Sequence, residues 1–167
     1  MGGYAMNTSL FLLTLLASLL TLSAHTVAQA QGDAVALREQ LMQAITRGDL
    51  AGAVALFADD AVIDGPGVCT AAPCVGKAAI QKEIGRRITE KNQPKTLSHY
   101  ASGNVLTTRI EVSSDMMRKA GAKRIIVWLV YEVKDGKIVA ERGPLFERTD
   151  PQTARYAEWL RTQQPSR

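Results

Sequence analysis

The chain has 167 residues and a formal net charge of +4 at pH 7, from 20 Lys and Arg against 16 Asp and Glu. This length is typical of one domain and gives no support to a multidomain organisation. Only 5% of the residues are aromatic, whereas nucleic-acid binding by base stacking needs aromatic side chains beside the basic ones. The composition therefore argues against a nucleic acid as a partner.

The first thirty residues have the pattern of a signal peptide. An apolar run extends from Leu10 to Leu22, and no charged residue precedes Asp33. The run is too short to span a bilayer. The small-x-small pattern of Ala28-Gln29-Ala30 then predicts cleavage before Gln31.

We therefore expect residues 1–30 to be a signal peptide and residues 31–167 to form one mature domain. The protein is then exported, to a periplasm or out of the cell, with no stable membrane insertion after cleavage. The alternative is an uncleaved membrane anchor. Translation from Met6 instead of Met1 would shorten the leader without adding charge.

The chain contains two cysteines, Cys69 and Cys74, and export places them in an oxidising compartment. We expect a disulfide between them. A redox-active pair usually has two residues between its cysteines, and a zinc site needs more ligands, so both alternatives are weaker.

Helical periodicity marks the first part of the mature chain. Gly48 is a stop signal for a first helix, Asp49 can cap a second, and Ile80, Ile84 and Ile88 recur every four residues on a third. The expected helices span Asp33–Arg47, Leu50 to about Ala58, and Lys77–Lys91, with a short strand at Ala61–Asp64 after the second. The third helix carries the main concentration of basic residues, which we interpret as a solvated helix face: Lys77, Lys82, Arg86, Arg87 and Lys91.

Beyond Pro94 the hydrophobic period changes to two, which predicts an antiparallel sheet. The expected strands are Tyr100 onward, Val105–Ser113, Arg124–Val133 and Lys137–Glu147, followed by a helix after Asp150-Pro151. Asp135-Gly136 is a two-residue hairpin signal. A run of helices followed by a run of strands indicates an α+β fold.

A two-residue turn predicts the pairing of the last two strands. Lys134 would lie opposite Lys137, Val130 opposite Glu141 and Trp128 opposite Gly143, so that Trp128 and Glu141 share one face. The opposite face of the Arg124–Val133 strand is apolar as well, and helices can cover only one side. We therefore expect a homodimer that packs the outer sheet faces together.

Several segments together resemble the nuclear transport factor two-like superfamily, which includes polyketide cyclase-like, limonene-epoxide hydrolase-like and ketosteroid isomerase-like domains. They are Arg47-Gly48-Asp49-Leu50, the run Ala55–Val62, the run Val75–Ile80 and Asp135-Gly136-Lys137-Ile138. The resemblance covers essentially the whole mature chain. It implies a cone, in which a curved antiparallel sheet wraps around N-terminal helices and encloses a mostly apolar pocket. This fold hosts many activities, and some of its members have none.

Ketosteroid isomerases need a carboxylate base beside an oxyanion hole of one tyrosine and one protonated aspartate. Under the resemblance, the base position falls on Gly65, with Asp64 as its acidic neighbour. The tyrosine position falls on Leu41 and the second aspartate on Leu129. Isomerase activity is therefore expected only if Asp64 turns inward.

The run Val105–Val112 is similar to the strand on which limonene-epoxide hydrolases place an arginine and, two residues later, an acidic residue facing the pocket. An arginine between two carboxylates can keep one of them protonated to donate to the epoxide oxygen, while the other activates water. Arg109 and Glu111 match the first half of this pattern. The second carboxylate position falls on Gly143, for which Glu141 is the candidate replacement. The residues that help to hold the water fall on Ile63 and Gly65.

The alternation along this strand leaves three interpretations of Arg109 and Glu111 open: a solvated strand face, a polar pocket wall, or a catalytic pair. Glu141 has the same three interpretations. The remaining candidates for the pocket lining are Asp64, Tyr100, Thr107 and Trp128.

No phosphate loop, nucleophile triad or metal-ligand cluster is present in the sequence, and His99 would be the only histidine left after cleavage. We therefore expect neither a cofactor nor a metal. The first interpretation is an exported cone domain that binds a small, largely apolar molecule. The alternatives are a cofactor-independent hydrolase or isomerase, with Glu111 or Glu141 as base and Arg109 as its electrostatic partner, and an interaction module with a filled pocket.

Overall fold

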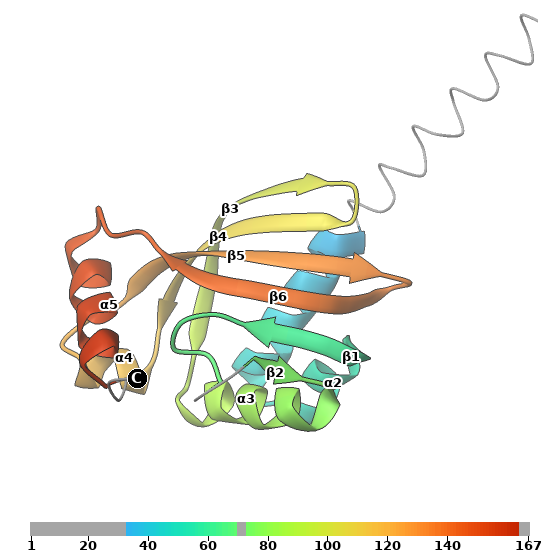
Figure 1. Ribbon diagram of the computed structural model, residues 1–167, viewed down its shortest axis with the longest axis horizontal. Helices are drawn as coiled ribbons and strands as arrows, with labels where there is room; N and C mark the ends of the chain where they lie inside the picture. The colour runs from blue at the N-terminus through green and yellow to red at the C-terminus, as the bar shows by residue number, and fades with distance from the viewer. Residues whose placement is uncertain (1–32, 70–72, 164–167) are drawn as a thin grey trace, which may run out of the picture.

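The computed structural model describes residues 33–69 and 73–163 of the chain (Figure 1). The predicted signal peptide lies outside these residues. The described residues form five helices: the N-terminal helix over residues 33–47, α2 (Leu50–Ala55), α3 (Lys77–Thr89), α4 (Asp115–Lys119) and α5 (Pro151–Gln163). Among the described residues, no helix is long and apolar enough to cross a membrane.

Six strands form one sheet in the order β2-β1-β6-β5-β4-β3 (Figure 1). Their bounds are β1 Phe57–Asp64, β2 Cys74–Val75, β3 Gln93–Ser102, β4 Val105–Ser113, β5 Ile125–Lys134 and β6 Lys137–Phe146. All neighbours are antiparallel except β1 and β6, which are parallel. The predicted α+β cone is thus confirmed, with a mixed sheet in place of an entirely antiparallel one.

The N-terminal helix forms because its apolar residues recur at helical spacing and pack against the sheet. Leu41 and Ile45 belong to the same buried core as Ile110 on β4 and Tyr131 on β5. After the stop at Gly48, the Asp49 carboxylate accepts a hydrogen bond of 2.8 Å from the backbone N–H of Gly52. The expected cap of α2 is therefore present.

The predicted end of α2 near Ala58 is wrong, because residues from Phe57 onward belong to β1. Phe57 pairs with Ile138 on β6, and the Ile138 N–H donates to the carbonyl oxygen of Leu56. Pairing with a distant strand therefore overrides the local helical pattern. The short helix α4, capped by the Ser114 hydroxyl, was not expected from the sequence.

The β5–β6 hairpin has the predicted turn, with Lys134 opposite Lys137. Beyond it the predicted register is wrong, because the pairing shifts between Glu132 and Val133 and again between Trp128 and Val130. A shift of one residue moves a side chain to the other face of a sheet. Glu141 therefore lies opposite Tyr131, on the inner face, instead of sharing a face with Trp128.

Alternation along β4 defines the two faces of the sheet. Four of its side chains are buried on the inner, helix-covered face: Leu106, Thr108, Ile110 and Val112. Thr107, Arg109 and Glu111 are half-buried on the outer face. Arg109 pairs with Trp128 in the strand register, which places Trp128 on that outer face as well.

Candidate functional site

A cavity lies on the inner face of the sheet, bounded by the N-terminal helix, α3, α4, α5 and the loop before Cys69. Inside it, the volume that the centre of a water molecule can occupy is about 90 Å³. Most of its wall is apolar, with contributions from Met42, Ile45, Pro66, Val68, Pro94, Ile110, Val112, Met116, Met117, Ile125, Val127, Leu129, Pro144, Phe146 and Leu160. This is the composition of a small-molecule site, in which a few polar groups orient an apolar ligand.

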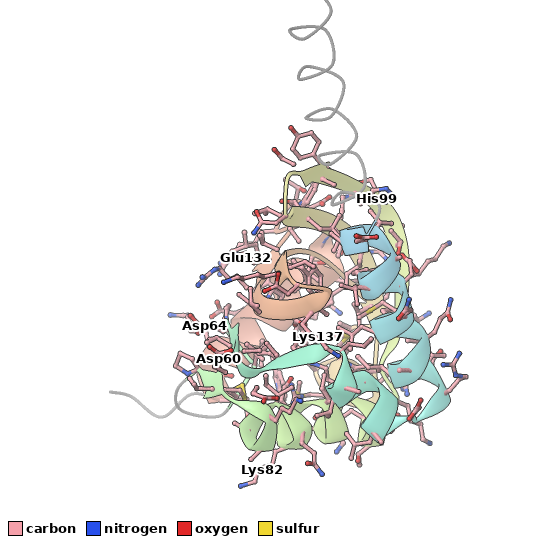
Figure 2. All side chains as sticks on the ribbon, turned by 90° about the vertical axis from the view of Figure 1, so that its right-hand side faces the viewer. Asp60, Asp64, Lys82, His99, Glu132 and Lys137 are labelled. Carbon is pink, nitrogen blue, oxygen red and sulfur yellow. A yellow bond between two sulfur atoms is a disulfide. The ribbon has the colours of Figure 1, made fainter. Side chains whose placement is uncertain are left out.

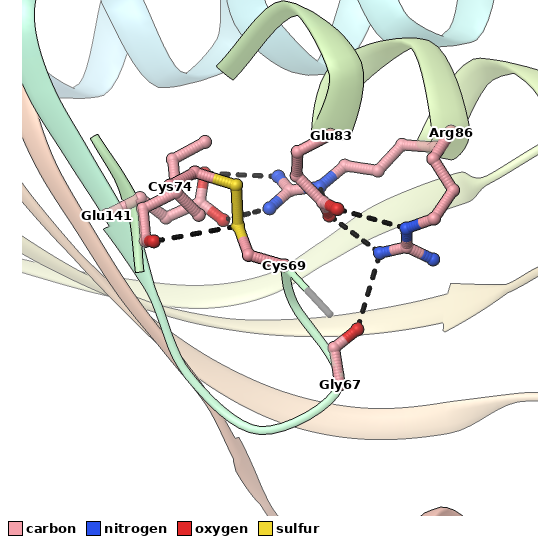
Figure 3. Close-up of a disulfide and its surroundings, with 8 residues drawn as sticks. Gly67, Cys69, Cys74, Glu83, Arg86 and Glu141 are labelled. Atoms are coloured by element: carbon pink, nitrogen blue, oxygen red, sulfur yellow. Dashed lines mark hydrogen bonds and ion pairs between the residues drawn. A yellow bond between two sulfur atoms is a disulfide. The ribbon is translucent and has the colours of Figure 1, made fainter. Parts of the chain in front are cut away.

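The polar part of the wall is an ionic cluster, defined as Glu83, Arg86, Arg87 and Glu90 together with Glu141 on β6. Arg87 lies between two carboxylates. Its Nε donates to Glu83 at 2.9 Å, and its Nη2 and Nη1 donate to the two oxygens of Glu141 at 2.7 and 3.2 Å. Figure 3 shows Glu83, Arg86 and Glu141 close to the Cys69–Cys74 disulfide.

Helical spacing brings the α3 members of the ionic cluster together. Residues 83, 86, 87 and 90 are three or four positions apart, and Arg86 donates both to Glu83 and to Glu90. Glu83 is 3% exposed and Arg87 8%. The interpretation of Arg86 and Arg87 as part of a solvated helix face is therefore wrong, although Lys77, Lys82 and Lys91 are exposed.

Within the ionic cluster, the charges of Glu83 and Arg87 are stabilised by their partners. Burial opposes the charge of Arg87, but Glu141 and Glu83 outweigh it and raise the pKa of Arg87. Burial likewise opposes the charge of Glu83, but Arg87 and Arg86 lower the pKa of that carboxyl below its ordinary value. Glu83 therefore has no proton to donate near neutral pH.

Three buried side chains have a polar atom without a hydrogen-bond partner among the described residues: Arg38, Asn92 and Tyr131. Of these, only Asn92 lines the cavity, with its Oδ1 unpaired. Tyr131 lies next to the cavity, two residues after the lining residue Leu129 on the same face of β5, and is paired with Glu141. Burial raises the pKa of Tyr131, so that its hydroxyl stays protonated.

The predicted disulfide between Cys69 and Cys74 is present, with the two Cα atoms 5.8 Å apart (Figure 3). It closes the loop that follows Pro66, Gly67 and Val68, which line the cavity. The carbonyl oxygen of Gly67 also accepts a hydrogen bond from Arg86 at 3.4 Å. The disulfide and the ionic cluster therefore hold the same part of the cavity wall.

Of the predicted site residues, only Glu141 lines the cavity. Arg109 and Glu111 lie on the outer face, where Arg109 pairs with Glu147 at 2.7 Å and Glu111 lies 3.4 Å from Arg124. Alternation along β4 puts both on the face opposite to Ile110 and Val112, so they do not form a pair at this cavity.

The four predicted pocket residues also lie outside the cavity lining. Thr107 and Trp128 are on the outer face, and Tyr100 is 69% exposed. Asp64 is exposed, and Figure 2 shows it at the surface, as it does His99. An arginine between two carboxylates is nevertheless present, with Arg87 in place of Arg109 and Glu83 in place of Glu111.

A signal for this arrangement was available in the sequence. Glu83 and Arg87 each follow an isoleucine of the apolar stripe, Ile80 and Ile84, by three positions, so they lie on the buried side of α3. A charged residue that is buried beside an apolar stripe needs an oppositely charged partner. The two glutamates and two arginines of the ionic cluster on α3 can be such partners for one another. No group of three or more His, Cys, Asp or Glu that could hold a metal ion occurs in residues 33–69 and 73–163.

Comparisons with known proteins agree with the fold. A family model described as SnoaL-like domain matches residues 38–141. No curated protein matches the chain. Among solved structures, a Mycobacterium tuberculosis LEH-like epoxide hydrolase is similar with a TM-score of 0.52 and 21% identity, over 67% of this chain and 81% of that one.

Two other similar structures contain or are named for a steroid. A Mycobacterium tuberculosis protein in complex with estradiol-17beta-hemisuccinate has a TM-score of 0.56 and 19% identity, over 66% of this chain and 92% of that one. A computationally designed 17-OHP binder has a TM-score of 0.58 and 20% identity, over 66% of this chain and 88% of that one. At these identities the similarity shows the cone fold alone.

Proposed function

The chain belongs to the SnoaL-like domain family, and from this premise we propose that it binds a small, largely apolar molecule in the cavity on the inner face of its sheet. The observation that carries the proposal is the cavity itself, which is apolar over most of its wall and polar at the ionic cluster. Two proteins of similar fold are described with steroids or as steroid binders, which supports a ligand of this size and polarity.

The open cavity favours binding over an interaction module. An interaction module with a filled pocket would have its own side chains in the space that Val127, Leu129 and Ile110 leave free. The volume of about 90 Å³ that the centre of a water molecule can occupy is several times what one water molecule needs. The interior is therefore available to a ligand.

The ionic cluster also favours binding over hydrolysis. Arg87 between Glu83 and Glu141 has the composition of an epoxide-opening site, which makes a hydrolase the second candidate function. General acid catalysis, however, needs a carboxyl group that keeps its proton at the working pH. Both oxygens of Glu141 accept from Arg87, and the pKa of Glu83 is lowered. These ion pairs are better suited to orienting a ligand than to donating a proton to it.

Filling the cavity should weaken binding. We expect Val127→Phe to weaken the affinity for estradiol and for the dye Nile red by at least about tenfold, because Val127 lines the cavity. The measurement is the fluorescence of Nile red bound to the oxidised protein and its displacement by estradiol. The matched control is Val130→Phe, on the outer face of the same strand, which should change either affinity by less than about twofold. Wild-type protein that binds neither probe would contradict the proposed function.

We also propose that the protein is a homodimer joined through its outer sheet face. Leu145 is 61% exposed there and lies opposite Trp128 in the strand register. Leu145 and the half-buried Trp128 are thus apolar neighbours on this face, and contiguous exposed apolar surface is typical of an interaction site. Size-exclusion chromatography with light scattering should give twice the mass of one chain, and Leu145→Glu should give a monomer of unchanged circular dichroism. A wild-type monomer would refute the dimer.

A further inference from the structure

We propose that the ligand of this cavity meets the ionic cluster with a hydrogen-bond-donating end that carries no negative charge. The chemical class is an apolar body with a protonated amine or, less tightly bound, an alcohol, and not a carboxylate, sulfonate or phosphate. This inference rests on the proposed function, because it specifies which small apolar molecules the same cavity selects.

The charge balance of the wall is the first reason. The charged side chains that line the cavity are Glu83, Glu90, Glu141, Arg86 and Arg87. Three carboxylates against two guanidinium groups leave an excess of one negative charge. Inside a cavity of apolar walls such an excess acts more strongly than in water, so it attracts a cation and repels an anion.

The second reason is that the donor groups of both arginines are already engaged. Arg87 uses Nε for Glu83 and both Nη atoms for Glu141. Arg86 uses Nε for Glu83, Nη1 for Glu90, and Nη2 for Glu83 and the carbonyl oxygen of Gly67. An anionic ligand would have to break these charge-assisted bonds in order to bind an arginine.

Acceptor groups, in contrast, remain available. Each carboxylate oxygen can accept about two hydrogen bonds. Within the described part of the chain, the two oxygens of Glu90 accept only from Arg86 Nη1, at 3.0 and 2.9 Å. Asn92 is also a lining residue, and its buried Oδ1 has no hydrogen-bond partner among the described residues. Ser114 and Tyr156 are lining residues as well, but a hydroxyl both donates and accepts and does not favour either kind of ligand.

The test compares three probes with one apolar body: 2-naphthylmethylamine, 2-naphthylmethanol and 2-naphthoic acid at pH 7. Each is titrated into the oxidised protein by displacement of Nile red. We expect the amine to bind most tightly and the acid at least about tenfold more weakly than the amine. An acid that binds as tightly as the amine would overturn the inference. So would failure of both the amine and the alcohol while Nile red still binds, whereas loss of Nile red binding as well would overturn the proposed function.

A charge variant tests whether the ionic cluster is the cause. Glu90→Gln removes the excess negative charge, and the ratio of amine affinity to acid affinity should fall by at least about fivefold. The matched control is Glu158→Gln on α5, which breaks an exposed pair with Arg161 outside the cavity lining. It should leave the ratio within about twofold. An unchanged ratio in Glu90→Gln would show that another group sets the preference and would contradict the inference.

Discussion

Replacement of Arg87 by methionine is expected to lower the free energy of unfolding by about 3–5 kcal/mol. Methionine keeps much of the volume of the side chain but leaves Glu141, which is 1% exposed, without the guanidinium that contacts both of its oxygens. Glu83 keeps Arg86 as a partner, so most of the cost falls on Glu141. Urea unfolding of the oxidised protein, followed by circular dichroism, measures the effect.

Two variants separate the loss of a buried partner from the loss of an arginine in general. Arg109→Met breaks the solvent-accessible pair with Glu147 and should lower the free energy of unfolding far less than Arg87→Met does. Adding Glu141→Leu to Arg87→Met should recover about 2 kcal/mol, because no unpaired charge then remains buried on β6. Suppose instead that Arg87→Met lowered the free energy of unfolding no more than Arg109→Met did. Glu141 would then be hydrated in solution, and our description of the ionic cluster as a buried part of the cavity wall would be wrong.

Elements that depend on local signals were predicted well from the sequence. Val105–Ser113 is a strand with the expected bounds, and Asp135-Gly136 forms the expected two-residue turn. Both follow from alternation and turn chemistry within a few residues. Export of the mature chain stays a prediction, because the leader lies outside the described residues.

Elements that depend on distant partners were not predictable in the same way. Phe57 begins a strand because it pairs with Ile138. The residues around Phe57 contain no pattern that indicates this pairing. The face on which Glu141 lies depends on an irregularity around Val139, where β6 has one residue more than β5. Regular alternation therefore extrapolated to the wrong register and grouped Glu141 with Trp128, which lies on the outer face. Arg109 entered the predicted site through the family resemblance, although alternation along its own strand also allowed the solvated face.

Burial of a charged residue is the hardest feature to read from a sequence. Arg87 belongs to a helix with several lysines, and its composition alone favours a solvated face. Its burial depends on Glu141, 54 positions later in the chain, which compensates its charge. The i,i+4 spacing of Glu83 and Arg87 beside the isoleucine stripe indicated a paired, inward position, but the partner strand could only be identified in the fold.

The two glycines at which the resemblance placed catalytic residues explain why such residues are absent. A Cβ atom on Gly65 would lie 1.9 Å from the carbonyl oxygen of Gly143. Gly143 itself has φ +118°, and a Cβ there would lie 2.8 Å from the carbonyl oxygen of Trp128. Both positions therefore need glycine for close backbone packing, and a carboxylate cannot be accommodated at either without movement of the backbone.

Gly65→Ala is accordingly expected to lower the free energy of unfolding by about 3 kcal/mol, from backbone strain at φ +153° together with the clash against Gly143. The matched control is Gly85→Ala within α3, where an added Cβ has no heavy atom within 4 Å. That change should raise the free energy of unfolding by about 0.5–1 kcal/mol, because alanine favours the helix. Urea unfolding of both variants decides the matter. A Gly65→Ala protein as stable as wild type would mean that β1 and β6 have room between them, and a carboxylate at Gly65 would then be a practical route to catalysis in this cone.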